Sequence, residues 1–225
     1  MTERGGADLL VDLYAAWDNI EDIDFSNLPD RFVLKANNGC GTVLLISNKN
    51  EVSIRRIRKI CKHWMKDKFG YLTAEIQYPP IKPMIIAEQF LENDTPSSSS
   101  IVDYKVFCLD GNPYCILVCA NRVIGEKAEL AFYDLEWNKI PDMLSGSHKA
   151  NDVSIEKPKC LKELLDAATL LAKGHPEVRV DFYIVNNRVF FGEMTFTSLG
   201  GYMDYIAPKY LDEMGARVTL PIQSI

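Results

Sequence analysis

Two acidic residues, an arginine and two threonines lie close together near the C-terminus, in the segments 179–183 and 191–197. Polar and apolar residues alternate through both segments, which predicts two half-buried β-strands. The turn-forming residues Asn186 and Asn187 lie between them, so the strands are predicted to form a hairpin. Carboxylates and hydroxyls on one sheet face, beside a cationic group, are typical of a site for magnesium and phosphate.

The alternation assigns the side chains of this hairpin to two faces. One face is polar, and the other is apolar and requires a core. The polar face is expected to carry Arg179, Asp181, Glu193, Thr195 and Thr197, and the apolar face Val180, Phe182, Ile184, Phe190, Met194 and Phe196.

The length of the hairpin loop decides whether the two acids meet. A two-residue loop would point them to opposite sides of the sheet, because a one-residue slip moves every side chain to the other face. A three-residue loop pairs Val185 with Val189 and places Asp181 opposite Glu193. We therefore predict the three-residue loop. Carboxylates that face each other repel, and either a bound cation or neutralisation by Arg179 would remove that repulsion.

A lysine and a glycine loop form a second candidate site. Lys35 precedes the loop Gly39-Cys40-Gly41. Glycines let backbone N–H groups approach phosphate oxygens closely, and a lysine supplies a point charge. The loop is predicted to join two strands rather than to begin a helix, so it is neither a P-loop nor a dinucleotide-binding fingerprint.

Other candidates lie on further predicted strands. The segment Glu88-Gln89-Phe90-Leu91 ends an apolar strand, where backbone amides can pair with the edge of an adenine. Asp103 and Lys105 share a face by the two-residue period, and Arg122 follows an apolar run. Surface charge explains each of them singly. Together with the acids of the hairpin they form a set that could hold a magnesium nucleotide.

Composition limits the classes of protein. A chain of 225 residues with 47% apolar and 25% charged residues is typical of a soluble globular protein with one domain or two small lobes. The net charge of -6 argues against general nucleic-acid binding. No apolar run approaches the roughly 20 residues of a membrane span, and the N-terminus lacks the apolar core of a signal peptide, so a cytoplasmic location is expected. The six cysteines form no C-x-x-C pair and are expected to be small buried hydrophobes, neither zinc ligands nor disulfides.

The strands and helices that position these residues are predicted to form an α+β fold rather than a doubly wound sheet. Basic residues of the first helix are expected to form a solvated face, and the serine-rich segment 93–100 a loop or a connector between lobes. The predicted strands are 32–36, 42–46, 84–88, 102–109, 113–121 and 129–134 together with the hairpin, and the predicted helices lie within 51–69 and 161–172.

The order of these segments resembles the ATP-grasp superfamily, and it is most similar to the TupA-like branch associated with teichuronopeptide and capsular-polysaccharide biosynthesis. The matching stretches are 28–39, 86–88, 103–108, 179–183 and 191–197, of which the last two are the most specific. The resemblance implies two α+β lobes that clamp a nucleotide, a small lobe at 30–95 and a large lobe at 96–225. Residues 1–29 are expected to be a lead-in, with the N-terminal domain of full ATP-grasp enzymes missing or reduced.

The resemblance also implies roles for the candidate residues. Thr195 departs from the family pattern Glu-x-Asn, and its hydroxyl is a poorer magnesium ligand than an amide oxygen. The implied magnesium ligands are Asp181, Glu193 and Thr195; the implied catalytic groups on phosphates and substrate are Lys105, Arg122 and Arg179; and the implied ATP contacts are Lys35, Gly39, Cys40, Gly41, Glu88, Gln89, Phe90 and Leu91, with Asp103 on the ribose.

The function that the resemblance implies is an ATP-dependent carboxylate–amine ligase that acts through an acylphosphate. It would attach an amino acid to a uronic acid of a surface or capsular polysaccharide, with ATP and Mg²⁺ as cofactors. Two alternatives stay open. One is a non-catalytic ATP-binding module that partners a glycosyltransferase. The other is a sugar kinase, for which the sequence offers no convincing general base.

Overall fold

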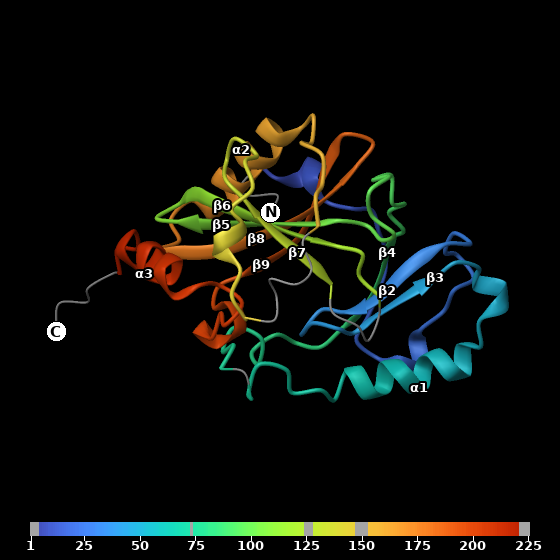
Figure 1. Cartoon of the computed structure of the whole chain (residues 1–225). Coiled ribbons are helices and arrows are strands. Elements are labelled where there is room, and N and C mark those ends of the chain that lie inside the picture. The colour runs from blue at the N-terminus through green and yellow to red at the C-terminus, as the bar shows by residue number, and fades with distance from the viewer. Residues whose placement is uncertain (1–4, 73, 124–127, 147–152, 221–225) are drawn as a thin grey trace. The chain divides into compact units, whose positions relative to one another are not determined.

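The computed structural model describes residues 5–72, 74–123, 128–146 and 153–220 (Figure 1). The chain divides into two compact units. We call Val11–Leu91 the small unit, and Met1–Leu10 with Glu92–Ile225 the large unit. Within the described residues, no helix combines the length and the apolar character that crossing a membrane requires.

The small unit contains one antiparallel sheet of four strands in the order β1-β4-β2-β3. Part of the expected lead-in belongs to it, because β1 pairs with β4 along one edge of the sheet. The strands are β1 (Leu13–Trp17), β2 (Phe32–Ala36), β3 (Val43–Ile46) and β4 (Ile85–Gln89).

Helix α1 (Ile54–Trp64) covers one face of this sheet. The Oγ of Ser53 accepts a hydrogen bond from the backbone N–H of Arg56 at 3.4 Å and caps the helix N-terminus. Ile57 and Cys61 lie one turn apart on the buried side of α1, in one core cluster with Phe32 and Leu34 of the sheet. The opposite face of the sheet, which carries Lys35, is therefore left for other contacts.

The large unit contains an antiparallel sheet of five strands in the order β7-β6-β5-β8-β9. The strands are β5 (Asp103–Leu109), β6 (Asn112–Ala120), β7 (Glu129–Tyr133), β8 (Glu177–Val185) and β9 (Arg188–Thr195), and the helices are α2 (Leu161–Ala172) and α3 (Pro208–Ala216). Short 3₁₀ turns lie at Ala7–Leu9, Ile20–Asp22, Lys49–Glu51, Pro141–Met143 and Ser198–Gly201.

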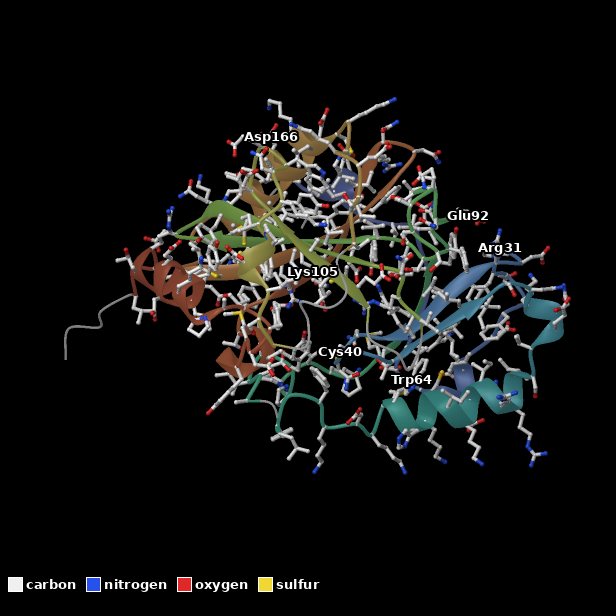
Figure 2. The ribbon with its side chains drawn as sticks, in the orientation of Figure 1. Arg31, Cys40, Trp64, Glu92, Lys105 and Asp166 are labelled. Atoms are coloured by element: carbon white, nitrogen blue, oxygen red, sulfur yellow. The ribbon has the colours of Figure 1, made fainter. Side chains whose placement is uncertain are left out.

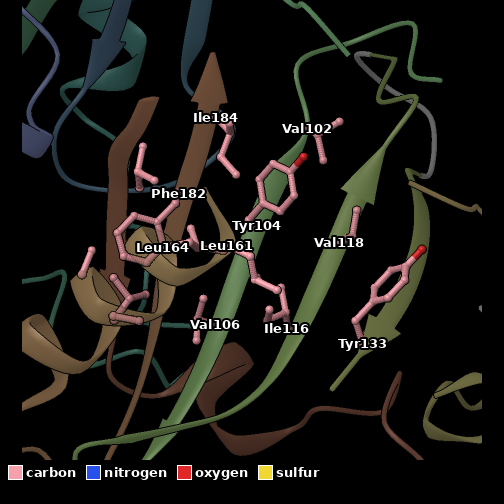
Figure 3. Packing of buried hydrophobic residues seen from close by; sticks show 14 of the residues in the cluster. Val102, Tyr104, Val106, Ile116, Val118, Tyr133, Leu161, Leu164, Phe182 and Ile184 are labelled. Atoms are coloured by element: carbon pink, nitrogen blue, oxygen red, sulfur yellow. The ribbon is translucent and has the colours of Figure 1, made fainter. Parts of the chain in front are cut away.

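The two faces of the five-stranded sheet have different partners. Alternate residues of β5, such as Tyr104 and Val106, point to the side covered by α2, where Leu161 and Leu164 pack against them (Figure 3). The residues between them point to the other face. The apolar part of that other face packs with residues from the turn and helix segments, and the cluster includes Phe107, Leu109, Cys115, Leu117, Met143, Leu144, Tyr205, Ile206 and Met214.

The loop of the β8–β9 hairpin differs from the prediction. Asn186 and Asn187 form a two-residue loop, with φ angles of 53° and 58°, and Val185 pairs with Arg188 rather than with Val189. Positive φ at both loop residues is the geometry whose twist matches the flanking strands, and Asn adopts it more readily than most residues. The prediction of a three-residue loop was wrong because both Asn residues adopt the left-handed conformation that closes a two-residue turn.

The predicted pairing of the two acids is nevertheless confirmed. Asp181 faces Glu193, because the register shifts by one residue beside Gly192. This bulge brings Phe191 rather than Phe190 to the face covered by α2, which corrects the expected position of Phe190. A Cβ atom on Gly192 would lie 3.0 Å from the carbonyl oxygen of Asp181, so glycine suits the bulge.

The last residues of the predicted hairpin lie outside the strand. β9 ends at Thr195, and Thr197 precedes the turn Ser198–Gly201. The expectation that Phe196 belongs to the core was wrong, because 37% of this residue is exposed and its ring lies edge-on to His175. Of the six cysteines, five are buried, as expected, and Cys40 is exposed.

Candidate active site

A row of charged side chains crosses the uncovered part of the five-stranded sheet. Lys105 (labelled in Figure 2) lies opposite Asp181 across β5 and β8, and Asp181 lies opposite Glu193 across β8 and β9. In the next row, Arg179 pairs with Thr195. The five residues therefore share one face because of the strand period and the bulge.

Asp181 is at the centre of this group. Its Oδ1 accepts a hydrogen bond from Nε of Arg179 at 2.7 Å, and its Oδ2 accepts from Nη2 of the same guanidinium at 2.9 Å. Lys105 donates to Oδ2 as well. Only 5% of the Asp181 side chain is exposed, so these bonds replace the solvation that the carboxylate loses on burial.

Arg179 connects Asp181 to the neighbouring polar groups. Its Nη2 lies 3.3 Å from Oε1 of Glu193 and donates to Oγ1 of Thr195 at 3.1 Å. Its Nη1 donates to Oγ of Ser198 at 3.3 Å. One guanidinium thus holds four oxygen-bearing side chains in place, which fixes the orientation of both acids.

A second ion pair adjoins this group on β5. Nη2 of Arg122 lies 2.6 Å from Oδ2 of Asp103, and Nζ of Lys105 lies 3.9 Å from the same oxygen. Asp103 also lies opposite Tyr183, and the negative charge of Asp103 together with burial holds the pKa of that phenol well above its usual value. Tyr183 is therefore a neutral hydrogen-bond donor at physiological pH.

The charges of the network stabilise one another. Burial acts against the ionised form of Asp181, but Lys105 and Arg179 outweigh it and lower its pKa to about 2. Burial likewise opposes the charge of Lys105, and the carboxylates of Asp181 and Asp103 raise its pKa in spite of it. Both groups are therefore ionised throughout the physiological range.

Of the two facing acids, Glu193 is the one whose negative charge is less stabilised by its neighbours. Burial and the neighbouring charge of Asp181 raise its pKa, and Lys105 and Arg179 offset only part of this effect. Its side chain keeps 39% exposure, compared with 5% for Asp181. Glu193 is thus the acid of the pair that is open to an additional cation.

The donor set agrees with what Mg²⁺ requires. The ion prefers oxygen ligands and usually takes one or two carboxylates, with the remaining positions filled by water and substrate phosphates. Asp181 and Glu193 supply two carboxylates from facing positions, with the hydroxyl of Thr195 beside Arg179. Within the described residues, no group of three or more His, Cys, Asp or Glu side chains is placed to hold a metal.

The small unit carries a separate charged group on the sheet face away from α1. Nζ of Lys35 lies 2.5 Å from Oε1 of Glu88, and the two side chains belong to neighbouring strands. Exposed apolar side chains of β3 extend the same face, with Val43 37% and Leu45 58% exposed. A half-exposed lysine beside apolar surface is suited to a ligand that has both a charged and a flat apolar part.

The glycines of the loop after β2 have different roles. A Cβ atom on Gly39 would lie 2.8 Å from Cβ of Phe69, so this glycine is required by packing. Gly41 has a φ of 73° and open space around it. Cys40, labelled in Figure 2, is exposed between them. Of the two glycines, only Gly41 has room beside its Cα for a ligand.

The end of β4 is held by two contacts. The N–H of Gln89 donates to the carbonyl of Asp12 at 2.8 Å, so this amide is already engaged. The guanidinium of Arg31 lies 4.5 Å from the centroid of the Phe90 ring. The predicted adenine contacts at Glu88, Gln89, Phe90 and Leu91 thus lie on or directly after an ordered strand end, and the Gln89 amide is not available to a base.

Three residues of the large-unit site had no role predicted from the sequence: Tyr183, Ser198 and Tyr205. Tyr183 could have been found, because the strand period places it on the face of Asp181. Ser198 and Tyr205 carry no such signal, since both lie in turns outside the strands. Tyr205 interacts with Arg179, and burial raises the pKa of its phenol to about 12.

A comparison with protein families identifies the group to which this architecture belongs. The family model described as TupA-like ATPgrasp matches residues 1–219. The chain belongs to the TupA-like ATP-grasp family. A comparison with curated proteins gave no match.

Solved structures agree with this family in fold. The D-alanine–D-alanine ligase of Bacillus anthracis matches with a TM-score of 0.50 and 18% identity, over 94% of this chain and 58% of the ligase. D-cycloserine synthetase DcsG matches with a TM-score of 0.50 and 11% identity, over 96% of this chain and 65% of the synthetase. The TupA-like chain thus has the expected ATP-grasp fold of the α+β class and spans about three fifths of the length of these enzymes.

Proposed function

We propose that this TupA-like ATP-grasp protein is an ATP-dependent carboxylate–amine ligase. The observation that carries the proposal is the row Lys105, Asp181 and Glu193 with Arg179 beside it, on one face of the large-unit sheet. Cations for phosphate oxygens and carboxylates for a divalent cation lie side by side there, in a chain of the ATP-grasp family.

Each charged group has a proposed task. Lys105, Arg122 and Arg179 bind phosphate oxygens or the carboxylate substrate, and Asp103 accepts from the ribose hydroxyls. In the small unit, Lys35 and the loop 39–41 bind phosphates, and the strand end at Phe90 and Leu91 contacts the base. Asp181 and Glu193 would hold Mg²⁺, with Thr195 as a further oxygen, and the bound ion would neutralise phosphate charge.

The proposed reaction has two steps that balance. A substrate carboxylate oxygen attacks the γ-phosphorus, the bond to the β-phosphate oxygen breaks, and ADP leaves. An amine nitrogen then attacks the carbonyl carbon of the acylphosphate, inorganic phosphate leaves, and the amine gives up a proton. The cationic side chains stabilise the phosphate charge in both steps, and the work of the chain is positioning and neutralisation.

The ion network gives this proposal a physical basis. Three carboxylates and three cations satisfy one another in the described large-unit site. A phosphate group that reaches Lys105 or Arg179 competes with Asp181 for them, and a divalent cation at the acids compensates for that loss. The network therefore supports binding of phosphate and magnesium together in preference to either alone.

The proposed substrates rest on the family resemblance alone. We propose a uronic acid of a surface or capsular polysaccharide as the carboxylate and an amino acid as the amine. A non-catalytic ATP-binding module that partners a glycosyltransferase, and a sugar kinase, are outcomes that the experiment separates.

The test is an assay of the purified protein with ATP, Mg²⁺, hydroxylamine and a panel of uronic acids. A ligase releases ADP and forms a hydroxamate with one acid of the panel, and Lys105→Gln abolishes both products. ADP without hydroxamate in the presence of a sugar would indicate a kinase. ATP-dependent thermal stabilisation without ADP release would indicate a binding module. A protein that shows no ATP binding and no turnover would exclude the proposal.

A further inference from the structure

Helix α1 and the segment after it concentrate the positive charge of the chain. Residues 55–68 contain seven Lys or Arg and one acid, Asp67, although the whole chain has a net charge of -6. Between Ile54 and Lys66 there is no acidic residue. Acidic residues at a spacing of four residues balance the charge of basic residues on a helix and stabilise it. This face lacks that balance.

The structure separates the basic residues of α1 into two groups. Arg58 turns toward the interior of the small unit, where its Nη2 donates to the carbonyls of Glu21 at 2.7 Å and Ile23 at 3.0 Å. The others are exposed on the side away from Ile57 and Cys61, which are buried. Within the part of the chain that the structure describes, the side chains in the stripe Arg55, Lys59 and Lys62 have no ion-pair partner.

Exposed apolar side chains follow directly after the helix. Leu72 is fully exposed, Ile76 is 75% exposed and Tyr71 is 66% exposed. Figure 1 shows the chain continuing into this segment from the C-terminal end of α1. Two contacts lie beside these side chains: the N–H of Glu75 donates to the carbonyl of Gly70, and the rings of Phe69 and Tyr78 meet edge-on.

We infer that α1, together with residues 66–72 and 74–76, docks on the surface of an anionic phospholipid bilayer. A stripe of Lys and Arg attracts anionic headgroups, and adjacent apolar side chains enter the boundary between headgroups and acyl chains. A soluble polyanion would engage the cations but would leave Leu72 and Ile76 in water. The combination of the two surfaces favours a bilayer over an acidic polysaccharide or a nucleic acid.

The experiment is sedimentation of the purified full chain with vesicles. One set of vesicles contains phosphatidylcholine alone and is neutral, and the other set contains phosphatidylcholine with phosphatidylglycerol and is anionic. The charge variant is R55Q/K59Q/K62Q and the apolar variant is L72S/I76S. The control K159Q/K162Q/K209Q removes the same charge from exposed positions of the large unit.

The chain is expected to sediment with the anionic vesicles only, and less as salt rises. The charge variant should weaken partitioning at least roughly tenfold, the apolar variant roughly fivefold, and the control less than about twofold. Equal binding to both vesicle types, no binding to either, or equal losses in the control would overturn the inference. Binding to a soluble acidic polysaccharide that the apolar variant leaves unchanged, without binding to vesicles, would replace the bilayer by that polymer. Circular dichroism of each variant checks that the fold is kept.

Discussion

In the large unit, 13% of the Lys105 side chain and 5% of the Asp181 side chain are exposed, and Arg179 donates two further hydrogen bonds to Asp181. In the small unit, Lys35 forms an ion pair with Glu88 while 32% of its side chain is exposed. The same kind of contact therefore has different consequences. A buried pair that loses one partner leaves an uncompensated charge, whereas water replaces a lost partner at the surface. The large-unit network should support both fold and function, and the small-unit pair function alone.

The largest expected effect tests the structural half of this comparison. Arg179→Met keeps most of the side-chain volume and removes two of the hydrogen bonds that hold Asp181. The free energy of unfolding should fall by roughly 3–5 kcal/mol, because a buried carboxylate loses a partner. Urea denaturation measures the loss. The matched variant Arg122→Met, whose side chain is 52% exposed, should lose about 1 kcal/mol or less. Equal losses in the two variants would contradict the distinction.

The next effect concerns the acid that is open to a cation. Glu193→Gln removes a charge opposite Asp181 and should weaken magnesium-dependent ATP binding at least roughly tenfold, while stability stays the same or rises slightly. Titration calorimetry with and without Mg²⁺ measures both affinities. The control is Glu163→Gln on the exposed side of α2. If both variants bind magnesium ATP like the parent protein, Glu193 is not a ligand.

Lys35→Gln tests the small unit. Affinity for ATP should fall about fivefold, and the free energy of unfolding should change by less than about 1 kcal/mol because the ion pair is partly exposed. Lys82→Gln breaks another ion pair of the same unit, with Asp18 at 2.6 Å, and should leave affinity unchanged. A loss of stability for Lys35→Gln as large as that of Arg179→Met would remove the difference between the two units.

The smallest effect concerns Glu177 on β8. Its Oε1 is buried and has no hydrogen-bond partner among the described residues, and burial raises its pKa from 4.5 to about 6. The folded state binds the proton of Glu177 more tightly than the unfolded state does. The contribution of this proton to the free energy of unfolding is therefore complete below pH 4.5 and is lost as pH rises through about 6. Glu177→Gln should remove this part of the pH dependence, about 1 kcal/mol after allowance for solvent screening. Thermal unfolding between pH 4 and pH 7 measures it. An unchanged pH profile in the variant would mean that Glu177 is solvated in the folded protein.

Part of the site could be predicted because strand periodicity is local. The alternation in 179–183 and 191–195 placed Arg179, Asp181, Glu193 and Thr195 on one face, and the structure agrees. The loop length could not be separated from the bulge, because a two-residue loop with a bulge and a three-residue loop give the same pairing at Asp181. The packing of Gly39 on Phe69 was out of reach, since the two residues are 30 positions apart in the chain.

The sequence by itself determined the types of most strands and helices, though not β1 or α3, together with the polar face of the hairpin and the family resemblance, because these depend on residue spacing along the chain. Only the tertiary structure decided which charges neutralise one another. Lys105 and Asp181 are brought together across β5 and β8, which are separated by β6, β7 and α2. The structure also decided that Arg179 holds both acids, and that Glu193 keeps the solvent access that Asp181 loses. Burial and strand pairing arise between distant segments, so the pKa of each acid follows from the fold and not from its neighbours in the chain.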